Sequence, residues 1–177
     1  MQVEITGAEG GLIAAPWTAQ HACWLRPTAP EVTLRWQVTS KATDYPQALF
    51  AQCDSRYTRA ASDIATKMAD VAGSAGGGSV GLRAIACHVA ELFPYGHVGK
   101  RFNDGHDEIP KLCSRTVGSC VDINTYFIAA TRGAGYEAGY VTGYFIPAEK
   151  RTHCDDMHCW VMTRCDGVVQ EWDIAIS

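Results

Sequence analysis

The spacing of hydrophobic residues changes several times along the chain, and each change predicts an element of secondary structure. Residues 31–40 read EVTLRWQVTS, with apolar side chains at every second position: Val32, Leu34, Trp36 and Val38. Because alternate residues of a strand point to the same face, this pattern predicts a half-buried β-strand. We expect a strand-rich N-terminal portion, up to about residue 58, that continues the main sheet or packs on it.

Helical spacing begins at Ser62, a residue type that commonly caps a helix, and it continues to Gly73. The apolar side of this helix contains Ile64, Met68, Val71 and Ala72. A glycine-rich loop follows over 73–79, and a second helix ends near Phe93, where Pro94 prevents its continuation. The apolar stripe of this second helix contains Ile85, Val89 and Leu92.

A third helix is predicted from about Cys120 to Arg132, where Gly-Ala-Gly ends it. Strand-like segments follow over 136–147, 158–165 and 168–173. The dipeptide Asp166-Gly167 separates the last two and is a strong signal for a two-residue hairpin turn. Helices followed by antiparallel strands predict an α+β fold.

Composition and charge limit the classes of function. The chain has 177 residues, 47% of them hydrophobic and 19% charged, so we expect one domain over 1–177, with a core over 59–177. The net charge is −4 and the basic residues are scattered, so nothing indicates nucleic acid or an anionic membrane as a partner. The N-terminus does not resemble a secretory signal, and we expect a cytoplasmic protein whose eight cysteines are reduced.

Cys120 is the first candidate for chemistry, because it falls at a predicted helix start in the segment GSCVD (118–122). Unpaired backbone N–H groups and the helix dipole stabilise a thiolate there, and Gly118 and Ser119 would let a substrate approach closely. A backbone N–H of this turn could donate to a developing oxyanion. Position alone also fits a small buried core cysteine.

The predicted hairpin supplies candidate partners for this thiol. If Asp166 and Gly167 form a two-residue turn, Cys165 pairs with Val168. Counting away from the turn along both strands then places Trp160 opposite Asp173. His158 lies two residues along on the same face, within reach of a hydrogen bond to Asp173. The other nitrogen of His158 would then be available for a thiol, provided that no bulge shifts the register.

The segments around these residues resemble the transglutaminase-like superfamily. Gly-x-Cys and an acidic residue occur at 118–122, followed by a helix ending in Arg-Gly and a strand with Gly-Tyr over 129–144. A His-x-Trp motif and a late Trp-Asp follow, at 157–161 and 171–173. The similarity extends over about 62–173. It implies a papain-like Cys-His-Asp triad, with Cys120 as nucleophile, His158 as general base and acid, and Asp173 orienting the histidine.

The resemblance implies an enzyme that acts on amide bonds through a thioester, in the first place a cysteine peptidase or amidase acting on a peptide or protein. Transfer of the acyl group of a protein glutamine to an amine, or a non-catalytic binding module, remains open. The weaker candidates for contacts to the substrate or oxyanion are Tyr95, Ser119 and Trp160. No cofactor is needed for this chemistry. Cys159 replaces the usual alanine beside the histidine, and the sequence does not indicate an oligomeric state.

A zinc site is an alternative for residues 152–160 together with Cys165, because the side chains of His153, Cys154, His158 and Cys159 are suitable ligands. Adjacent strand residues point to opposite faces, however, so His158 and Cys159 would not easily share an ion. We therefore expect no metal, and we expect His153, Cys154, Asp155 and Asp156 to form a solvated loop. The remaining cysteines are expected to be small core residues: Cys23, Cys53, Cys87, Cys113 and Cys165.

Overall fold

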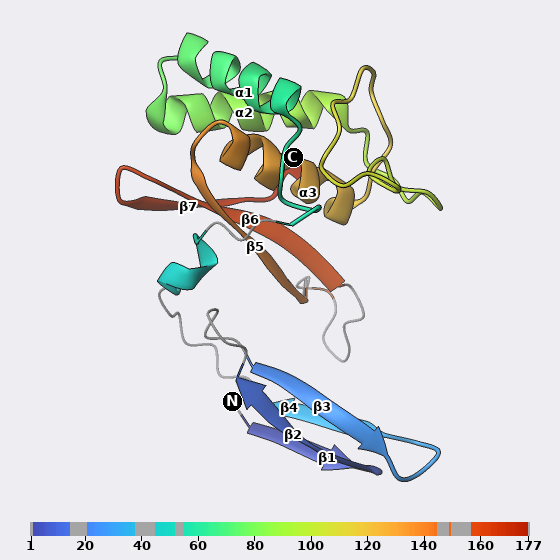
Figure 1. The fold of residues 1–177 in the computed structure, drawn as a ribbon. Coiled ribbons are helices and arrows are strands. Elements are labelled where there is room, and N and C mark those ends of the chain that lie inside the picture. The colour runs from blue at the N-terminus through green and yellow to red at the C-terminus, as the bar shows by residue number, and fades with distance from the viewer. Residues whose placement is uncertain are drawn as a thin grey trace. The chain divides into compact units, whose positions relative to one another are not determined.

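The computed structural model describes residues 2–14, 21–37, 45–51, 55–144, 149 and 157–176. By contacts between Cα atoms the chain divides into two compact units, Met1–Leu49 and Phe50–Ser177 (Figure 1). Each unit has its own secondary structure and is treated separately below. That the two units form a single domain stays a prediction.

The N-terminal unit consists of two antiparallel pairs of strands. β1 (Gln2–Thr6) pairs with β4 (Thr33–Gln37), and β2 (Ala8–Ala14) pairs with β3 (His21–Pro27). β4 confirms the alternating strand as far as Gln37, whereas Val38 lies outside the described residues. Among the described residues these strands pair only with one another, so they do not continue the main sheet, and the alternative that they pack on it stays a prediction.

The second unit begins with the two predicted helices, α1 (Ser62–Ser74) and α2 (Gly78–Leu92). Their buried positions follow the predicted stripes, with Ile64 and Met68 on α1 and Ile85 and Val89 on α2. Ser62 is not the cap that was expected. It is the first residue of α1 itself, and Ala61 occupies the cap position without a side-chain hydrogen bond.

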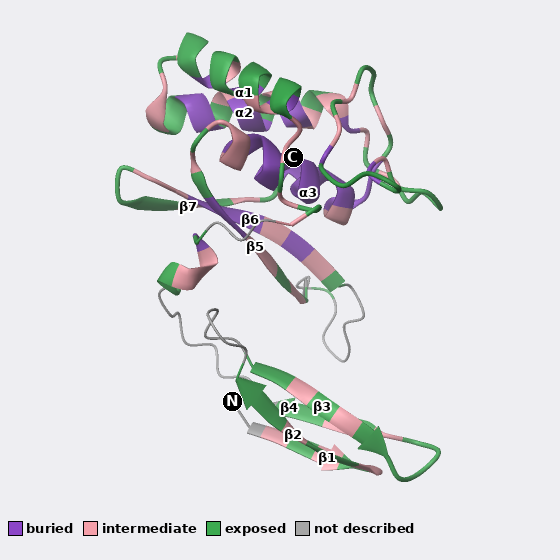
Figure 2. Cartoon of the chain, viewed as in Figure 1, coloured by how far each residue is buried: buried purple, intermediate pink, exposed green. Residues whose placement is uncertain are grey.

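The third helix, α3 (Cys120–Gly133), is the central element of this unit. It contacts both α1 and α2 as well as the strands β5 and β6, so helices lie on one side of it and the sheet on the other (Figure 1). Nearly every residue from Asp122 to Thr131 is buried, as the purple ribbon of α3 shows (Figure 2). A helix covered on two sides needs apolar residues around most of its circumference, which explains its weak amphipathic pattern.

The sheet consists of β5 (Glu137–Tyr144), β6 (Met157–Cys165) and β7 (Val168–Trp172), with β6 in the centre. The hairpin has the predicted register, since Cys165 pairs with Val168 and Val161 with Trp172. The turn residues Asp166 and Gly167 both have positive φ, at 52° and 77°, as the tight hairpin turn requires. Helices packed on an antiparallel sheet, together with a strand-rich N-terminus, confirm the α+β class.

Several cysteines do not lie in the core where they were expected. Cys87 and Cys113 are exposed, and Cys23 and Cys165 are half-buried. Cys87 lies on the solvent side of α2, next to the buried Ala86. The side of the helix on which a residue lies determines its exposure here, and the average preference of cysteine for the interior does not. Cys53 lies outside the described residues. All six described cysteines are free thiols.

Candidate active site

Cys120 is the first residue of α3, and its side chain is 8% exposed. Ser119 precedes it as the helix cap and forms a capping box with Asp122. The Asp122 Oδ2 atom accepts the backbone N–H of Ser119 at 2.9 Å and the Ser119 hydroxyl at 2.8 Å. Together with the bond from the Asp122 backbone N–H to the Ser119 side chain, which completes the box, they fix the turn of backbone that carries the thiol.

The backbone just before Cys120 is held by the segment around Tyr95. Gly118 donates to the carbonyl of Pro94 at 3.1 Å and accepts the N–H of Gly96 at 2.9 Å. Gly118 is buried, and a Cβ atom there would lie 2.9 Å from the Phe93 ring and 2.8 Å from the Asp122 Cβ atom. The glycine is therefore explained by close packing of the protein against itself, not by the approach of a substrate as expected.

His158 and Asp173 form the hydrogen bond that the hairpin register predicts. The Nε2 atom of His158 lies 2.6 Å from the Oδ2 atom of Asp173, and the side chains are 12% and 33% exposed. Asp173 follows Trp172, whose ring packs edge-on against Phe127 of α3 and whose Nε1 donates to Thr163 at 2.7 Å. The end of β7 is thus anchored on both α3 and β6, which fixes the position of the carboxylate.

A buried amide joins α3 to the strand that carries His158. Asn124 lies one helical turn after Cys120, and its Nδ2 atom is 2.7 Å from the carbonyl oxygen of Cys159 and 3.7 Å from the Cys159 sulfur. Burial raises the pKa of Cys159 to about 11, while hydrogen bonds from Tyr140 and Asn124 oppose this rise. A hydrogen bond also joins the thiols of Cys159 and Cys120, so the two are neighbours.

Tyr95 and Trp160 lie close to these groups. Burial raises the pKa of Tyr95, and negative charge on Cys120, Cys159 or Asp173 would raise it further, so its hydroxyl keeps its proton near these three side chains. Its ring is 55% exposed. A Cβ atom placed on Gly143, the cross-strand partner of His158, would lie 3.0 Å from the Trp160 ring. The missing side chain at position 143 therefore leaves room for the indole beside the histidine.

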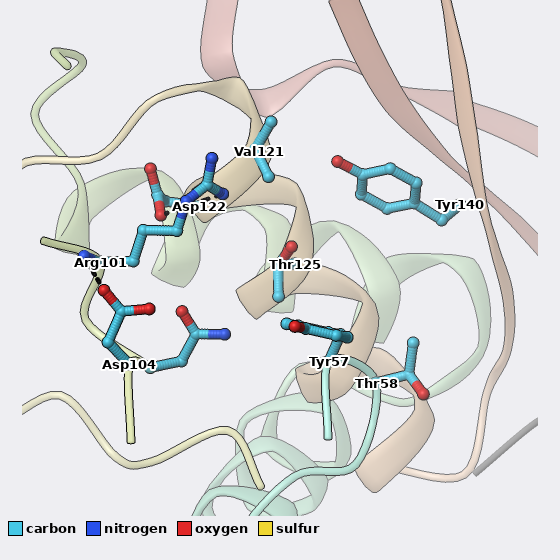
Figure 3. Close-up of a pocket in the computed structure, with 9 residues that line it drawn as sticks. Tyr57, Thr58, Arg101, Asp104, Val121, Asp122, Thr125 and Tyr140 are labelled. Atoms are coloured by element: carbon cyan, nitrogen blue, oxygen red, sulfur yellow. Dashed lines mark hydrogen bonds and ion pairs between the residues drawn. The ribbon is translucent and has the colours of Figure 1, made fainter. Parts of the chain in front are cut away.

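A cavity of about 560 Å³ adjoins this region (Figure 3). Its lining residues are Tyr57, Thr58, Arg101, Asn103, Asp104, Val121, Asp122, Thr125 and Tyr140. Val121 and Asp122 directly follow Cys120, and the Tyr140 hydroxyl hydrogen-bonds the Cys159 sulfur, whereas none of Cys120, His158 and Asp173 lines the cavity. Burial is the main cause that raises the pKa of Tyr140, and the hydrogen bond to Cys159 raises it further. The cavity is therefore next to the thiol pair but separate from it.

Arg101 and Asp122 face one another at the edge of this cavity, with Nη1 and Oδ1 3.7 Å apart (Figure 3). The Asp122 side chain is only 3% exposed, while that of Arg101 is 46% exposed. Asp122 thus has two roles, because one of its oxygens closes the capping box and the other faces the cation. Such a pairing reduces the cost of burying the carboxylate.

The structure describes only some of the residues that were considered as zinc ligands. His153, Cys154, Asp155 and Asp156 lie outside the described residues, so their expected loop stays a prediction. Where the structure describes the chain, no three or more His, Cys, Asp or Glu side chains cluster closely enough to hold a metal ion. No helix in the described part is long and apolar enough to cross a membrane.

Three side chains of this region were not singled out from the sequence: Asn124, Tyr140 and Arg101. Asn124 gave a usable signal, since it is a polar residue four positions after Cys120 and therefore on the same side of the predicted helix. The capping box was also readable as the pattern Ser-x-x-Asp at 119–122. Tyr140 and Arg101 gave no local signal, because their importance depends on which segments the fold brings together.

The match of a family model agrees with the resemblance noted in the sequence. The family model of the transglutaminase-like superfamily matches residues 63–172. Among solved structures, one from Parabacteroides distasonis, described as a "putative protease", aligns with a TM-score of 0.44 and 12% sequence identity. The alignment covers 96% of this chain, which spans only 36% of that protein. No curated protein matches the chain significantly.

Proposed function

Because the chain belongs to the transglutaminase-like superfamily, we propose that it is a cysteine peptidase or amidase in which Cys120, His158 and Asp173 form a catalytic triad. The observation that carries this proposal is the 2.6 Å hydrogen bond between His158 and Asp173, formed beside the strand residue whose thiol contacts Cys120. The proposal requires a reduced thiol, which fits the cytoplasmic location expected from the sequence.

In the proposed reaction, the Cys120 thiolate attacks the carbonyl carbon of an amide, and the C–S bond forms as the carbonyl π electrons move to oxygen. The protonated His158 then gives its proton to the amide nitrogen, so the C–N bond breaks and an amine leaves. The remaining thioester is attacked by water, from which neutral His158 takes a proton. Collapse of that intermediate releases the acid and regenerates the thiolate and imidazolium.

Asp173 would act on this cycle through the histidine. Its carboxylate accepts a hydrogen bond from Nε2 and so directs Nδ1, the other ring nitrogen, toward the reacting groups. It also stabilises the imidazolium that exists before the leaving amine is protonated. Hydrogen-bonded carboxylates commonly orient the base in such arrangements.

The developing oxyanion would be stabilised at the start of α3. The N–H groups of Gly118 and Ser119 already have partners, and Asp122 and Ile123 use theirs within the helix turn. For the described residues, this leaves the N–H groups of Cys120 and Val121 as the donors at this helix end. The Tyr95 hydroxyl, which keeps its proton, is a further candidate donor. We therefore assign Ser119 to capping and not to the oxyanion hole.

The substrate is proposed to be a peptide or a protein amide, and the steps above need no cofactor. The cavity lined by Val121 and Asp122, the residues that follow Cys120, has room for side chains of such a substrate. Peptide libraries incubated with the protein and analysed by mass spectrometry test this directly. We expect cleavage that disappears in Cys120→Ala, while that variant unfolds at the same temperature as the wild-type protein.

The same assay separates the alternatives that the sequence left open. If an added primary amine appears in the products in place of water, the protein is an acyltransferase. If no product forms with any amide, and Cys120→Ala binds peptides as the wild-type chain does, the chain is a binding module. Hydrolysis in the presence of competing amine is the outcome that we expect.

A further inference from the structure

Asn124 is a polar residue in a part of the protein where polar residues are costly. Its side chain is fully buried, at 0% exposure, on a helix whose neighbouring residues Ile123, Phe127 and Ile128 are buried apolar side chains. Burial of an amide without hydrogen bonds destabilises the folded state, because the amide loses its hydrogen bonds to water. A buried amide is therefore retained only where its bonds offset that cost or where it serves a purpose other than stability.

The hydrogen bonds of Asn124 satisfy only half of its amide. Both contacts of its Nδ2 atom go to Cys159, one to the carbonyl oxygen at 2.7 Å and one to the sulfur at 3.7 Å. Its Oδ1 atom is buried and has no hydrogen-bond partner within the described part of the chain. The unpaired oxygen makes this residue a poor choice for stability alone, since an apolar side chain of the same size would leave no acceptor unsatisfied.

The strand segment that Asn124 contacts is the part of β6 with the fewest strand partners. β5 pairs with β6 from Arg164 down to Met157, whereas in the described residues β7 pairs with it only as far as Val161. Residues 157–160, which include His158, thus have a neighbouring strand on one side only. The Asn124 amide supplies a hydrogen bond to this segment from the helix instead.

Helix spacing places Cys120 and Asn124 on the same side of α3, because residues four apart lie one above the other. Asn124 contacts the residue adjacent to His158, and the Cys159 thiol contacts Cys120. This short hydrogen bond therefore joins the helix turn after the sulfur directly to the strand segment that carries the imidazole. A change in this bond would move the two reacting groups relative to one another.

We propose that Asn124 is a positioning residue that holds the strand segment of His158 at the distance from Cys120 that activates the thiol. This inference rests on the proposed function, but it concerns a side chain that touches neither the substrate nor the imidazole. A displacement of about 1 Å between reacting groups can reduce a rate about a hundredfold. Loss of the hydrogen bond between Asn124 and the Cys159 carbonyl would allow such a displacement.

The test compares Asn124→Leu with Thr131→Val as a matched control. Thr131 is also fully buried on α3, but its hydroxyl bonds to carbonyls of α3 itself, those of Phe127 at 2.9 Å and Ile128 at 3.0 Å. Each variant loses two polar contacts of one buried side chain on the same helix, at similar side-chain volume. The measured quantity is the rate of alkylation of Cys120 by iodoacetamide, with exposed Cys87 as an internal reference.

At pH 7 we expect Asn124→Leu to lower the alkylation rate of Cys120 about tenfold or more relative to Cys87. The rate should approach that of the wild-type protein at high pH, where any thiol ionises without help. Thr131→Val should stay close to the wild-type rate at every pH. Cys159→Ala retains the carbonyl that Asn124 contacts, so it should show a smaller loss than Asn124→Leu.

The outcomes separate this inference from the proposed function. If wild-type Cys120 reacts no faster than Cys87, the proposed function fails and the inference fails with it. If the wild-type thiol reacts fast and folded Asn124→Leu reacts equally fast, the positioning role is wrong while the triad remains. Thermal unfolding verifies that each variant is folded at the labelling temperature, and Asn124→Ala is judged by the same criteria if the leucine variant does not fold.

Discussion

The Nε2 atom of His158 lies 2.6 Å from the Oδ2 atom of Asp173, across a hairpin whose register is set by two turn residues. The imidazole comes from β6 and the carboxylate from the residue after β7, so neither can move independently of the hairpin. Trp172 anchors that strand end through Phe127 and Thr163. The pair is therefore a rigid feature of the sheet, as an orienting contact requires.

Two replacements of Asp173 should distinguish its role in orienting His158 from the effect of its negative charge. Asp173→Ala removes the acceptor from Nε2, and we expect kcat to fall about tenfold to a hundredfold because the imidazole can then rotate. Asp173→Asn can still accept through its amide oxygen and should lose less. Steady-state kinetics on a cleaved peptide measure both effects. Equal activity of all three proteins would mean that the carboxylate does not orient the base.

Gly143→Ala should disturb the histidine through the neighbouring indole. The new Cβ atom would lie 3.0 Å from the Trp160 ring, which must move, and position 143 pairs directly with His158. We expect a lower kcat and a small loss of stability. Gly73→Ala is the control, because nothing lies within 4 Å of its added Cβ atom and alanine favours the helix by about 0.5–1 kcal/mol. If Gly143→Ala and Gly73→Ala have the same kcat and stability, the Trp160 indole does not hold His158 in place.

Ser119→Ala should affect stability more than catalysis. The loss of the cap should lower the free energy of unfolding by about 1 kcal/mol. The serine hydroxyl faces Asp122, so kcat should change little at temperatures where the variant is folded. Urea denaturation measures the first effect, with Ser62→Ala as control because the start of α1 has no side-chain cap bond. A large fall in kcat without a loss of stability would mean that Ser119 contributes to the oxyanion hole.

Glu137 and Arg164 should make a small contribution to stability that depends on pH. Two hydrogen bonds of 2.6 and 2.7 Å to Arg164 lower the pKa of Glu137. A carboxyl group with a lowered folded-state pKa stabilises the fold above its unfolded pKa of about 4.3, and this stabilisation is lost as the pH falls through the folded value. The Glu137 side chain is 48% exposed, so solvent screens the pair and the effect is modest.

Thermal unfolding of Glu137→Gln across a pH series tests this contribution. The variant should be less stable than the wild-type protein at pH 7. The difference should shrink as the pH falls below the unfolded pKa of glutamate and disappear below the lowered pKa of Glu137 in the folded state. High salt should also reduce the difference at pH 7, since the pair is exposed. A difference that persists unchanged at low pH would show that the charge of Glu137 is not its cause.

The sequence predicted those features that local chemistry determines. A two-residue turn fixes every pair in a hairpin, which is why Asp166-Gly167 was enough to bring His158 and Asp173 together. The buried stripes of α1 and α2 likewise follow from helical spacing. The family motifs agree with the match over residues 63–172.

The remaining features depend on tertiary contacts that spacing cannot reveal. Gly118 is explained by Phe93, which comes from the end of a different helix, and Asn124 by a carbonyl 35 residues away. Cys87 and Cys113 were misplaced because the preference of cysteine for the interior is only an average over many proteins. The cap of α1 shifted by one residue, a difference that sequence rules do not resolve.

The order in which the thiols react with limiting iodoacetamide at pH 7 tests the account most directly. Cys87 and Cys113 are exposed and Cys120 is only 8% exposed, so accessibility alone favours the first two. Cys159, with its pKa raised to about 11, remains un-ionised and does not compete. If His158 activates the sulfur, peptide mapping will find the first adduct on Cys120, and His158→Ala will remove that preference. Labelling of Cys87 and Cys113 before Cys120 in the wild-type protein would contradict the account.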